Sequence, residues 1–390
     1  MSRVHEPTRA EELRDALAAA ASAHCSIELV GGDSKRLMAG RVAEPDVRIS
    51  TARMRRVLQF EPRDLTISVE AGLPFAELNT LLAKHGQMIP LDGPWSENAT
   101  VGGMIAANIN GARRRRYGSA RDLVIGMTFA TLEGKLVETG GMVVENVAGL
   151  DMAKLMIGSF GTLAAIASVN FRLVARPEIT RTLMYSCDTI TAAQEIRDRV
   201  LQGVLNPLAV EIINPVLAAQ LSMKGFQVAI QFAGSAAVIR RCVKEAEAFG
   251  VTRPLTADEE SRFWQSLGAL TPRFLDKFRE GVVVRVSTKL AECGEALASV
   301  EGAGLAHSGS GIVRAWFTRP DPASRWLAHA LKRGWKGVVE FAGDAARSGL
   351  TLWPNAPEAQ SDGGFAIMRE IKRMFDPESL LNRGRLYGKL

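Results

Sequence analysis

The residues with the clearest chemical potential are glycines in four separate segments. The longest is NATVGGMIAANING, residues 98–111, which carries paired glycines and no charge and precedes four arginines, residues 113–116. Because glycine has no Cβ, its main-chain amide can approach a phosphate or a planar ring closely. The segment therefore indicates a surface for such a ligand. A buried turn or a close helix contact would need the same small residues.

Three further segments share this character. VGGDSK, residues 30–35, opens a Gly-Gly turn after an apolar strand end, where successive amides can form an anion-binding nest. GSFGTL, residues 158–163, and LNRGR, residues 381–385, follow later in the chain. Neither the Walker loop nor the GxGxxG loop has this spacing, so those two nucleotide-binding motifs do not explain the glycines.

The composition favours a soluble enzyme subunit. A chain of 390 residues that is 47% hydrophobic can bury a large core and is expected to form two domains. The charged amino terminus reads as an amphipathic helix, with Thr8 as N-cap and Glu11 completing a capping box, rather than a secretory signal. Since no run of 18 apolar residues occurs, we expect no membrane-spanning segment and a cytoplasmic location.

The cysteines and the charge exclude other classes. The four cysteines are far apart and lack CxxC or ferredoxin spacing, so we expect neither an iron-sulfur cluster nor a disulfide framework. The net charge is +6 and the isoelectric point is near 9.3, but aromatic residues are only 6% and no stacking platform accompanies the basic residues. We therefore expect no nucleic acid, and an anionic cofactor, an anionic substrate or an acidic partner subunit explains the charge.

The hydrophobic periodicity gives the elements that position these residues. The first domain opens with a helix and closes with a strand. After Arg176-Pro177, the expected boundary, the pattern changes to units of strand, helix and strand. We predict strands at 26–30, 47–50, 66–70, 123–132, 136–139, 164–174, 181–186, 208–213, 228–232, 282–287 and 312–317, and helices at 8–23, 75–85, 191–202 and 236–249.

Taken in order, the four segments resemble the FAD-binding domain of the vanillyl-alcohol oxidase type, also called the PCMH type. Within that superfamily the chain is similar to the FAD-binding E-type subunit of bacterial glycolate oxidase, on VGGDSK, ATVGGMIAANINGARRRR, GSARDLVIG and FDPESLLNRGRLY. The resemblance implies an α+β fold. It comprises a PCMH-type FAD-binding domain of two subdomains at 1–176, a substrate or cap domain at 177–365 with a mixed or antiparallel sheet covered by helices, and a C-terminal tail at 366–390 that returns to the FAD domain.

The resemblance also implies which residues hold FAD. The diphosphate is expected on Gly31, Gly32, Asp33, Ser34 and Lys35; the flavin side on Pro90, Thr100, Val101, Gly102, Gly103 and Ala107, with Ile166 through its main chain and Asn382 from the tail. For Pro90 and Ile166 plain core packing is the alternative. Many relatives attach flavin covalently through a histidine in the first glycine loop, and because Asp33 takes that place here we expect noncovalent FAD.

The resemblance further implies oxidation of a 2-hydroxy acid, which needs a base for the hydroxyl proton, a cation for the carboxylate and flavin to accept hydride. His307 and Arg314, in AHSGSGIVR, are the candidates. Fuller catalytic subunits usually carry a second histidine and an acid in this stretch, where this chain has Ser310 and Val313, so we expect no metal. A structural role for His307 is the alternative.

Three roles are open for the arginines at 113–116. They hold a carboxylate or flavin phosphate, form a solvated loop, or dock an acidic partner. With no iron-sulfur centre in the chain, electrons leaving FAD need dioxygen, a diffusible acceptor or another subunit, and the resemblance favours another subunit.

Three functions stay open at this point. The first is a redox-active FAD subunit of a glycolate oxidase complex, with a larger FAD subunit and an iron-sulfur subunit as partners and a location peripheral to the inner membrane face through the complex. The second is a non-catalytic FAD-containing scaffold of that complex. The third is a stand-alone flavin dehydrogenase for another alcohol or hydroxy acid.

Overall fold

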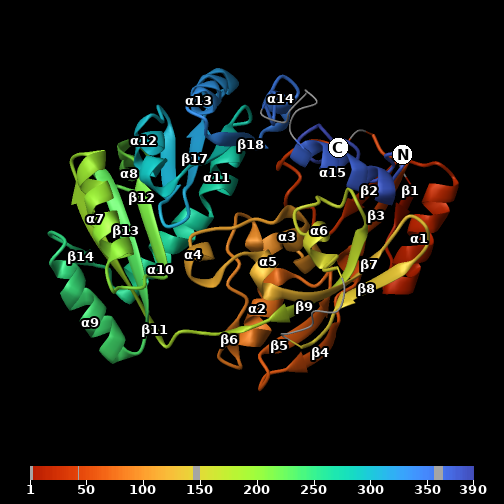
Figure 1. Ribbon diagram of the computed structural model, residues 1–390, viewed down its shortest axis with the longest axis horizontal. Helices are drawn as coiled ribbons and strands as arrows, with labels where there is room; N and C mark the ends of the chain where they lie inside the picture. Colours follow the sequence, from red (N-terminus) through yellow and green to blue (C-terminus); the bar gives the residue numbers. More distant parts are fainter. Residues whose placement is uncertain (1–2, 43, 144–149, 355–362) are drawn as a thin grey trace. The chain divides into compact units, whose positions relative to one another are not determined.

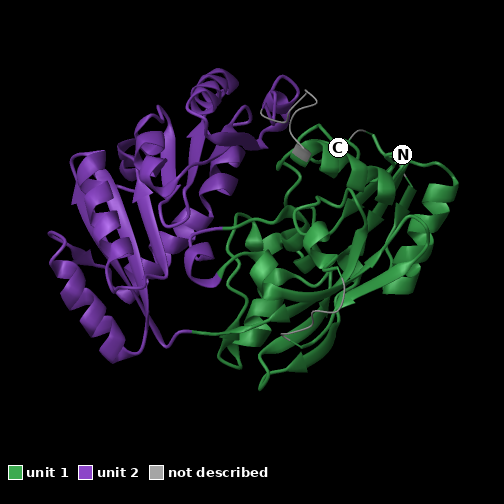
Figure 2. Ribbon diagram, viewed as in Figure 1, with its two compact units in different colours: residues 1–110, 118–176, 356–390 green, residues 111–117, 177–355 purple. Residues whose placement is uncertain are grey.

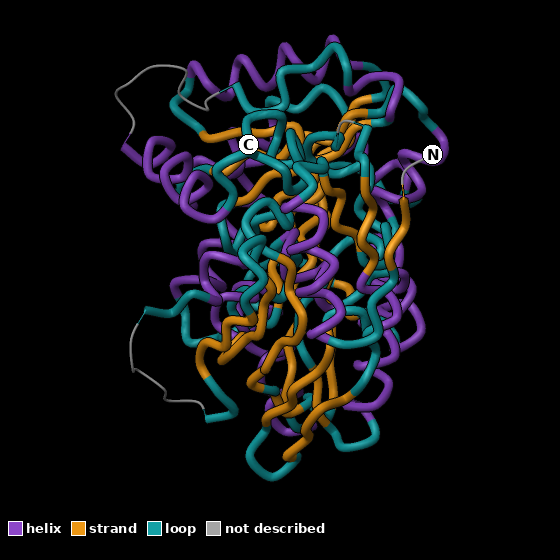
Figure 3. The backbone as a smooth tube through the Cα atoms, turned by 90° about the vertical axis from the view of Figure 1, so that its right-hand side faces the viewer, coloured by secondary structure: helices purple, strands orange, loops and turns teal. Residues whose placement is uncertain are grey.

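The computed structural model describes residues 3–42, 44–143, 150–354 and 363–390, which form two compact units (Figures 1 and 2). Unit 1 comprises residues 1–110, 118–176 and 356–390, and unit 2 comprises residues 111–117 and 177–355. Figure 3 distinguishes helices, strands and loops in a second view. Both chain ends belong to unit 1, whereas the arginines at 113–116 belong to unit 2.

Unit 1 contains two main sheets. A three-stranded parallel sheet has the order β1-β3-β2, and a five-stranded antiparallel sheet has the order β4-β5-β9-β7-β8; β6 and β10 form a further antiparallel pair. The strands are β1 Arg3–His5, β2 Ile27–Val30, β3 Val47–Ser50, β4 Val57–Glu61, β5 Thr66–Glu70, β6 Gln87–Met88, β7 Val124–Ala130, β8 Leu136–Gly140, β9 Ala165–Arg172 and β10 Val174–Ala175. The helices are α1 Ala10–Ser22, α2 Phe75–Ala83, α3 Val101–Ala107, α5 Ala120–Leu123, α6 Ala153–Met156 and α15 Gly363–Phe375, with short 3-10 turns at Thr51–Arg53 and Ser96–Asn98.

Helix α1 packs on the parallel sheet through one apolar stripe. Its Leu13 and Leu17 are fully buried and share a cluster with Ile27 and Ile49 of the sheet. The expected capping box with Glu11 is wrong by one residue: the amide and hydroxyl of Thr8 both donate to Glu12 at 2.8 Å. The helix begins at Ala10, so Glu12 rather than Glu11 is the carboxylate that reaches back to Thr8.

Unit 2 is built on one eight-stranded antiparallel sheet of order β14-β11-β13-β12-β16-β17-β15-β18. Its strands are β11 Ile179–Cys187, β12 Ala209–Ile213, β13 Phe226–Gly234, β14 Arg253–Pro254, β15 Val282–Ser287, β16 Ala303–His307, β17 Ile312–Phe317 and β18 Lys336–Ala342. Its helices are α4 Arg114–Tyr117, α7 Ile190–Gln202, α8 Pro215–Gln220, α9 Ala236–Glu247, α10 Ala257–Gly268, α11 Leu270–Lys277, α12 Cys293–Ala298, α13 Pro320–Lys332 and α14 Asp344–Arg347, with a 3-10 turn at Leu290–Glu292.

The two faces of this sheet are covered by different helices. On β11, Tyr185 donates to Ala246 of α9 and Thr182 donates to Glu260 of α10. Since the two residues are three apart along a strand, they point to opposite faces, and α9 and α10 therefore cover opposite faces. Strand register places Glu211 of β12 on the face of Thr182, because Thr182 pairs with Gln231, Gln231 pairs with Ala209, and Ala209 is two residues from Glu211.

Candidate functional site

The glycine loop of unit 1 presents main-chain amides that the protein does not use. Among the described residues, the amides of Gly32, Asp33, Ser34 and Lys35 donate to no protein acceptor. Asp33 has a left-handed φ of 53°, the type of conformation that turns successive amides to one side. Its carboxylate instead pairs with Arg48 at 2.9 Å, so its main chain is the group available to an anion.

Lys35 places a buried cation at the end of this loop. Its side chain is only 7% exposed, and its ammonium donates to the Ser34 hydroxyl at 3.3 Å. No carboxylate among the described residues pairs with it. Burial lowers the pKa of Lys35 to about 7, because the charged form loses hydration without gaining an anion. An anionic group bound beside Lys35 would supply that missing charge.

The predicted cofactor segment at residues 98–111 contacts the glycine loop. A Cβ on Gly31 would lie 2.2 Å from the hydroxyl of Thr100, and a Cβ on Gly32 would lie 2.5 Å from the carbonyl oxygen of Asn98. Thr100 caps α3, since its hydroxyl accepts from the amide of Gly103 at 3.3 Å. The structure therefore brings the residues predicted in two distant segments side by side, and the paired glycines at 31 and 32 are needed for that approach.

Gly102 and Gly103 have different surroundings. The amide of Gly102 donates to Ala71 at 2.7 Å, and a Cβ on Gly102 would lie 2.8 Å from the Cβ of Ala71. A Cβ on Gly103 would meet only the Thr100 hydroxyl, at 3.2 Å. The absence of a side chain at Gly102 is thus explained by packing of α3 on Ala71, and of the two glycines only Gly103 keeps open space for a ligand.

The remaining predicted cofactor residues are buried in unit 1. Val101 and Ile166 belong to its main apolar cluster, and Pro90 and Ala107 are also buried. The Asn382 side chain accepts from the amide of Leu29 at 2.7 Å and donates to the carbonyl oxygen of Phe160 at 2.7 Å. It therefore joins the start of the glycine loop to the 158–161 segment; any contact of these residues with flavin stays a prediction.

The residues of this loop fit the diphosphate of FAD. Four unused amides and one buried ammonium form a donor set for an anion with two phosphates, and within the described part of the chain no carboxylate pairs with Lys35. Residues 31–35 would hold the diphosphate, and FAD, when bound, supplies the group that accepts hydride.

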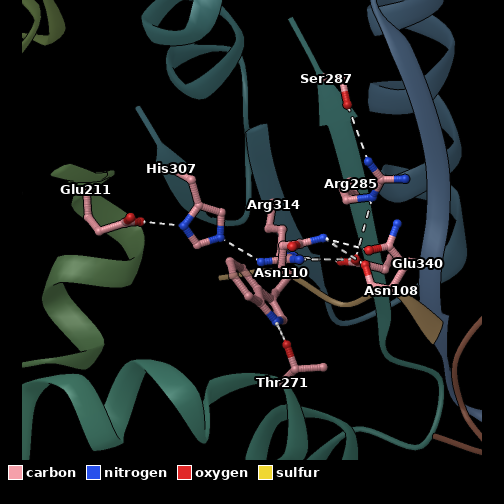
Figure 4. Close-up of polar contacts among 10 residues, drawn as sticks. Asn108, Asn110, Glu211, Thr271, Arg285, Ser287, His307, Arg314 and Glu340 are labelled. Carbon is pink, nitrogen blue, oxygen red and sulfur yellow. Dashed lines mark hydrogen bonds and ion pairs between the residues drawn. The ribbon is translucent and has the colours of Figure 1, made fainter. Parts of the chain in front are cut away.

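Unit 2 assembles a buried charged network around His307 (Figure 4). His307 ends β16, opposite Glu211 of β12 in register, with its Nδ1 2.8 Å from a Glu211 carboxylate oxygen. That pair is an electrostatic contact rather than a hydrogen bond. On the other side, Nη1 of Arg314 lies 2.6 Å from Nε2 of His307. All three residues are less than 9% exposed.

Glu340 and Arg285 complete this network. Glu340 of β18 accepts two hydrogen bonds from Arg314, at 2.6 and 3.1 Å, and lies 3.5 Å from Arg285. Burial raises the pKa of Glu340, but Arg314, Arg285 and His307 together outweigh burial and hold that pKa below its usual range. Arg285 is opposite Arg314 in register and half-buried, and it also donates to Ser287 at 3.3 Å.

The network limits what His307 can do chemically. A guanidinium only donates hydrogen bonds, so Nε2 of His307 is the acceptor, and the hydrogen-bond pattern assigns the proton of the neutral ring to Nδ1, facing Glu211. In this arrangement the lone pair that a general base needs is engaged by Arg314. Arg314 is in turn bound at two points by Glu340 rather than left open for a substrate carboxylate.

The arginine run lies beside the loop that follows His307. Arg115 donates to the carbonyl oxygen of Gly309 at 3.4 Å, and its Cδ lies 2.4 Å from where a Cβ on Gly309 would be. Arg114, Arg115 and Arg116 are exposed. Unit 2 thus brings together two segments that the sequence separates by almost 200 residues.

Two parts of the chain match known protein families. Residues 1–140 match the family described as FAD binding domain, and residues 349–386 match the family described as FAD linked oxidases, C-terminal domain. The chain carries an FAD binding domain. The structure of p-cresol methylhydroxylase with substrate bound has a TM-score of 0.75 over 99% of this chain and 88% of that chain, at 13% identity. This likeness confirms the expected α+β fold of PCMH-type FAD-binding proteins.

Two curated relatives share sequence with this chain. Glycolate oxidase subunit GlcE of Escherichia coli (strain K12) is 36% identical over 149 residues, a match that covers 38% of this chain and 43% of GlcE. D-2-hydroxyglutarate dehydrogenase of Xanthomonas citri pv. viticola is 25% identical over 410 residues, which cover 94% of this chain and 85% of the relative.

Other site types receive no support in the described part of the chain. Within it, no group of three or more His, Cys, Asp or Glu residues is arranged to hold a metal ion, and no helix is long and apolar enough to cross a bilayer. The four cysteines are free thiols, and burial raises the pKa of Cys293 to about 11.

Sequence reasoning missed several polar residues that the fold places at these sites. Glu211, Arg285 and Glu340 each lie between apolar residues of a strand, AVEII, VVVRVS and KGVVEFA. A single charge in a buried strand needs a partner. That pattern is the signal that could have found them, although it would not have identified the partners.

Proposed function

We propose that this chain is the FAD-binding subunit of a 2-hydroxy-acid dehydrogenase complex of the glycolate oxidase kind. Electrons from the hydroxy acid pass through its FAD to partner subunits, which we expect to be a larger FAD subunit and an iron-sulfur subunit. The similarity to a glycolate oxidase subunit and to a D-2-hydroxyglutarate dehydrogenase supports this proposal.

The observation that carries the proposal is the pairing of His307 with Arg314. Oxidation of a 2-hydroxy acid removes a hydride from the hydroxyl-bearing carbon and a proton from the hydroxyl, and bound FAD accepts the hydride. His307 would hold the proton at Nε2, and Arg314 would hold the carboxylate through its guanidinium. Both roles require Arg314 to release Nε2 of His307 and one of its two hydrogen bonds to Glu340 when substrate binds.

A second function, an FAD-containing scaffold, is favoured by the completeness of the network. Arg314 already has two carboxylate hydrogen bonds, and His307 lies between Glu211 and Arg314. A network closed in this way stabilises the sheet and needs no substrate. Under this proposal the hydroxy acid is oxidised on the larger flavoprotein, and this chain holds the complex together.

Flavin bleaching separates the two functions. The purified chain, alone and then with its partner subunits, is mixed anaerobically with glycolate, D-lactate and D-2-hydroxyglutarate while flavin absorbance is followed. Rapid bleaching of the isolated subunit supports catalysis by this chain. Bleaching that needs the larger subunit supports the scaffold, and no bleaching by any hydroxy acid in either state contradicts both.

We also propose that FAD is noncovalent and that the complex is cytoplasmic, peripheral to the inner membrane face through its partners. Asp33 occupies the expected attachment place and is paired with Arg48. Acid precipitation should release the flavin into the supernatant; flavin that stays with the precipitated polypeptide contradicts noncovalent binding. Fractionation of cells that express the chain without its partners should leave it out of the membrane pellet.

A further inference from the structure

The guanidinium of Arg385 donates to three carbonyl oxygens of residues 35–40, at the end of the glycine loop and just after it. Its Nη2 donates to Lys35 at 2.6 Å, and its Nη1 donates to Gly40 at 2.6 Å and to Met38. The contact is reciprocal, because the amide of Gly40 donates to the carbonyl oxygen of Arg385 at 3.0 Å. One side chain of the C-terminal tail thus fixes residues 35–40 at three points.

The tail that carries Arg385 is anchored beside β2. The amide of Ile27 donates to Leu380 at 2.8 Å, and the amide of Asn382 donates back to Ile27 at 2.8 Å. The Asn382 side chain also accepts from Leu29, two residues before Gly31. Asn382 therefore holds the entry to the glycine loop, and Arg385 holds its exit.

A buried ion pair fixes the base of this tail. The ammonium of Lys372 donates to Asp376, to Thr162 at 2.7 Å and to Leu381 at 3.2 Å. The carboxylate of Asp376 accepts from the amides of Leu380 and Leu381 at 2.8 Å each. Lys372 is 4% exposed and Asp376 is fully buried, so Arg385 projects from a turn with satisfied polar groups.

Fixing these carbonyl oxygens also fixes the neighbouring amides. In a planar trans peptide the carbonyl oxygen and the N–H point in opposite directions, so a held carbonyl sets the orientation of the amide in the same unit. The loop then closes two turns, from Arg36 to Asp33 and from Met38 to Lys35. The held Lys35 carbonyl sets the Arg36 amide, and because that amide donates to the Asp33 carbonyl, it also sets the unused Ser34 amide, which shares a peptide unit with the Asp33 carbonyl. The Ser34 amide is thereby oriented before an anion arrives, which lowers the ordering cost of binding.

We propose that Arg385 is a positioning residue for FAD, which raises affinity for the diphosphate by holding residues 35–40. Its guanidinium acts on the cofactor through the loop. The inference rests on the glycine loop and the C-terminal tail of unit 1 and is independent of the substrate and partners proposed above.

The neighbouring Arg383 provides a matched control. It is exposed, lies two residues away, and its Nε donates to the carbonyl oxygen of Ser379 at 3.0 Å. We expect Arg385→Ala apoprotein to bind FAD and ADP about 10-fold or more weakly, by similar factors, since both ligands carry the diphosphate. Arg383→Ala should bind both as the wild type does. Arg385→Lys should recover only part of the loss, because one ammonium lacks the planar fork.

Chemical rescue distinguishes loop positioning from a general loss of structure. Millimolar methylguanidinium should restore FAD affinity to Arg385→Ala, whereas sodium chloride at the same ionic strength should not. Wild-type affinity in Arg385→Ala, or an equal loss in Arg383→Ala, would overturn the proposal. So would an Arg385→Ala apoprotein that has lost its near-ultraviolet circular dichroism and regains neither structure nor FAD with methylguanidinium.

Discussion

Nη1 of Arg314 lies 2.6 Å from Nε2 of His307, and this contact places the ring proton of neutral His307 on the side of Glu211. The candidate base and the candidate carboxylate-binding residue are therefore bound to each other. The carboxylate of Glu340 neutralises the charge of Arg314. The same carboxylate therefore affects both the stability of the network and the ability of Arg314 to bind a substrate carboxylate.

Removing the charge of Glu340 should destabilise the protein strongly. Glu340→Gln leaves the buried Arg314 without its carboxylate, a change that typically costs about 3 to 5 kcal/mol. Glu301→Gln, which breaks an exposed pair with Arg325 at 3.8 Å, should cost about 0 to 1 kcal/mol. Urea denaturation of both variants measures the difference, and equal midpoints would show that the buried network does not stabilise the fold.

Replacing His307 tests catalysis directly. If His307 holds the hydroxyl proton, His307→Ala should slow flavin reduction by about 100-fold or more, the usual scale for a positioned base. Stopped-flow absorbance of the assembled complex gives the rate, with FAD content and the unfolding midpoint as controls. Normal reduction in a folded, FAD-loaded variant would instead place the reacting substrate on the partner flavoprotein.

FAD affinity should fall as pH rises above 7. Burial lowers the pKa of Lys35 to about 7, and the protonated form is the one that binds phosphate, so FAD binding takes up a proton above that pH. Affinity should decrease by up to about tenfold per pH unit between pH 7 and 9. Titration of apoprotein by flavin fluorescence follows this change.

The controls for that pH dependence are two methionine variants. Lys35→Met should bind FAD weakly with no decline between pH 7 and 9, while Lys135→Met, which removes an exposed lysine of unit 1, should behave as the wild type. In the apoprotein the sign is opposite: the unfolded chain binds more protons than the folded one between pH 7 and the ordinary lysine pKa of 10.5, so Lys35 should make stability rise with pH there. A pH-independent affinity in the wild type would exclude Lys35 from the phosphate site.

Valine at Gly102 and Gly103 should have different effects, although the resemblance places both glycines on the flavin side. Gly102→Val forces a side chain against Ala71 and should destabilise the fold by about 1 to 3 kcal/mol. Gly103→Val meets only the Thr100 hydroxyl and should lower FAD content with little change in the apoprotein unfolding midpoint. Full FAD occupancy in Gly103→Val would show that the segment at residues 98–111 does not contact FAD.

Charge reversal tests the arginine run as a docking surface. Arg115 packs on Gly309, so its replacement would also disturb that contact. The exposed Arg114 and Arg116 are therefore the positions to change. Arg114→Glu/Arg116→Glu should retain FAD and weaken co-purification with the other subunits in a salt-sensitive way. The matched control is Arg240→Glu/Lys244→Glu on α9, which changes the net charge equally. Assembly unaffected at low salt in the first variant would leave 113–116 as a solvated loop.

The sequence by itself predicted the FAD-binding fold and much of the strand framework. Strands 47–50, 66–70, 282–287 and 312–317 have the predicted bounds, because their apolar residues follow the strand period without interruption. The glycine loop was also visible in sequence, since a Gly-Gly turn after an apolar strand is a local signal. Strand β18 was missed, and with it Glu340.

Only the tertiary structure decided which charges meet. Glu211, His307, Arg314 and Glu340 come from strands β12, β16, β17 and β18, with β15, an earlier strand of the chain, inserted between β17 and β18 in the sheet, and Arg385 reaches residues 35–40 across almost 350 positions. Local periodicity fixes which residues form a strand, but strand order and register fix which side chains face one another. For that reason the sequence could name His307 and Arg314, whereas the carboxylates that restrain them emerged only from the folded sheet.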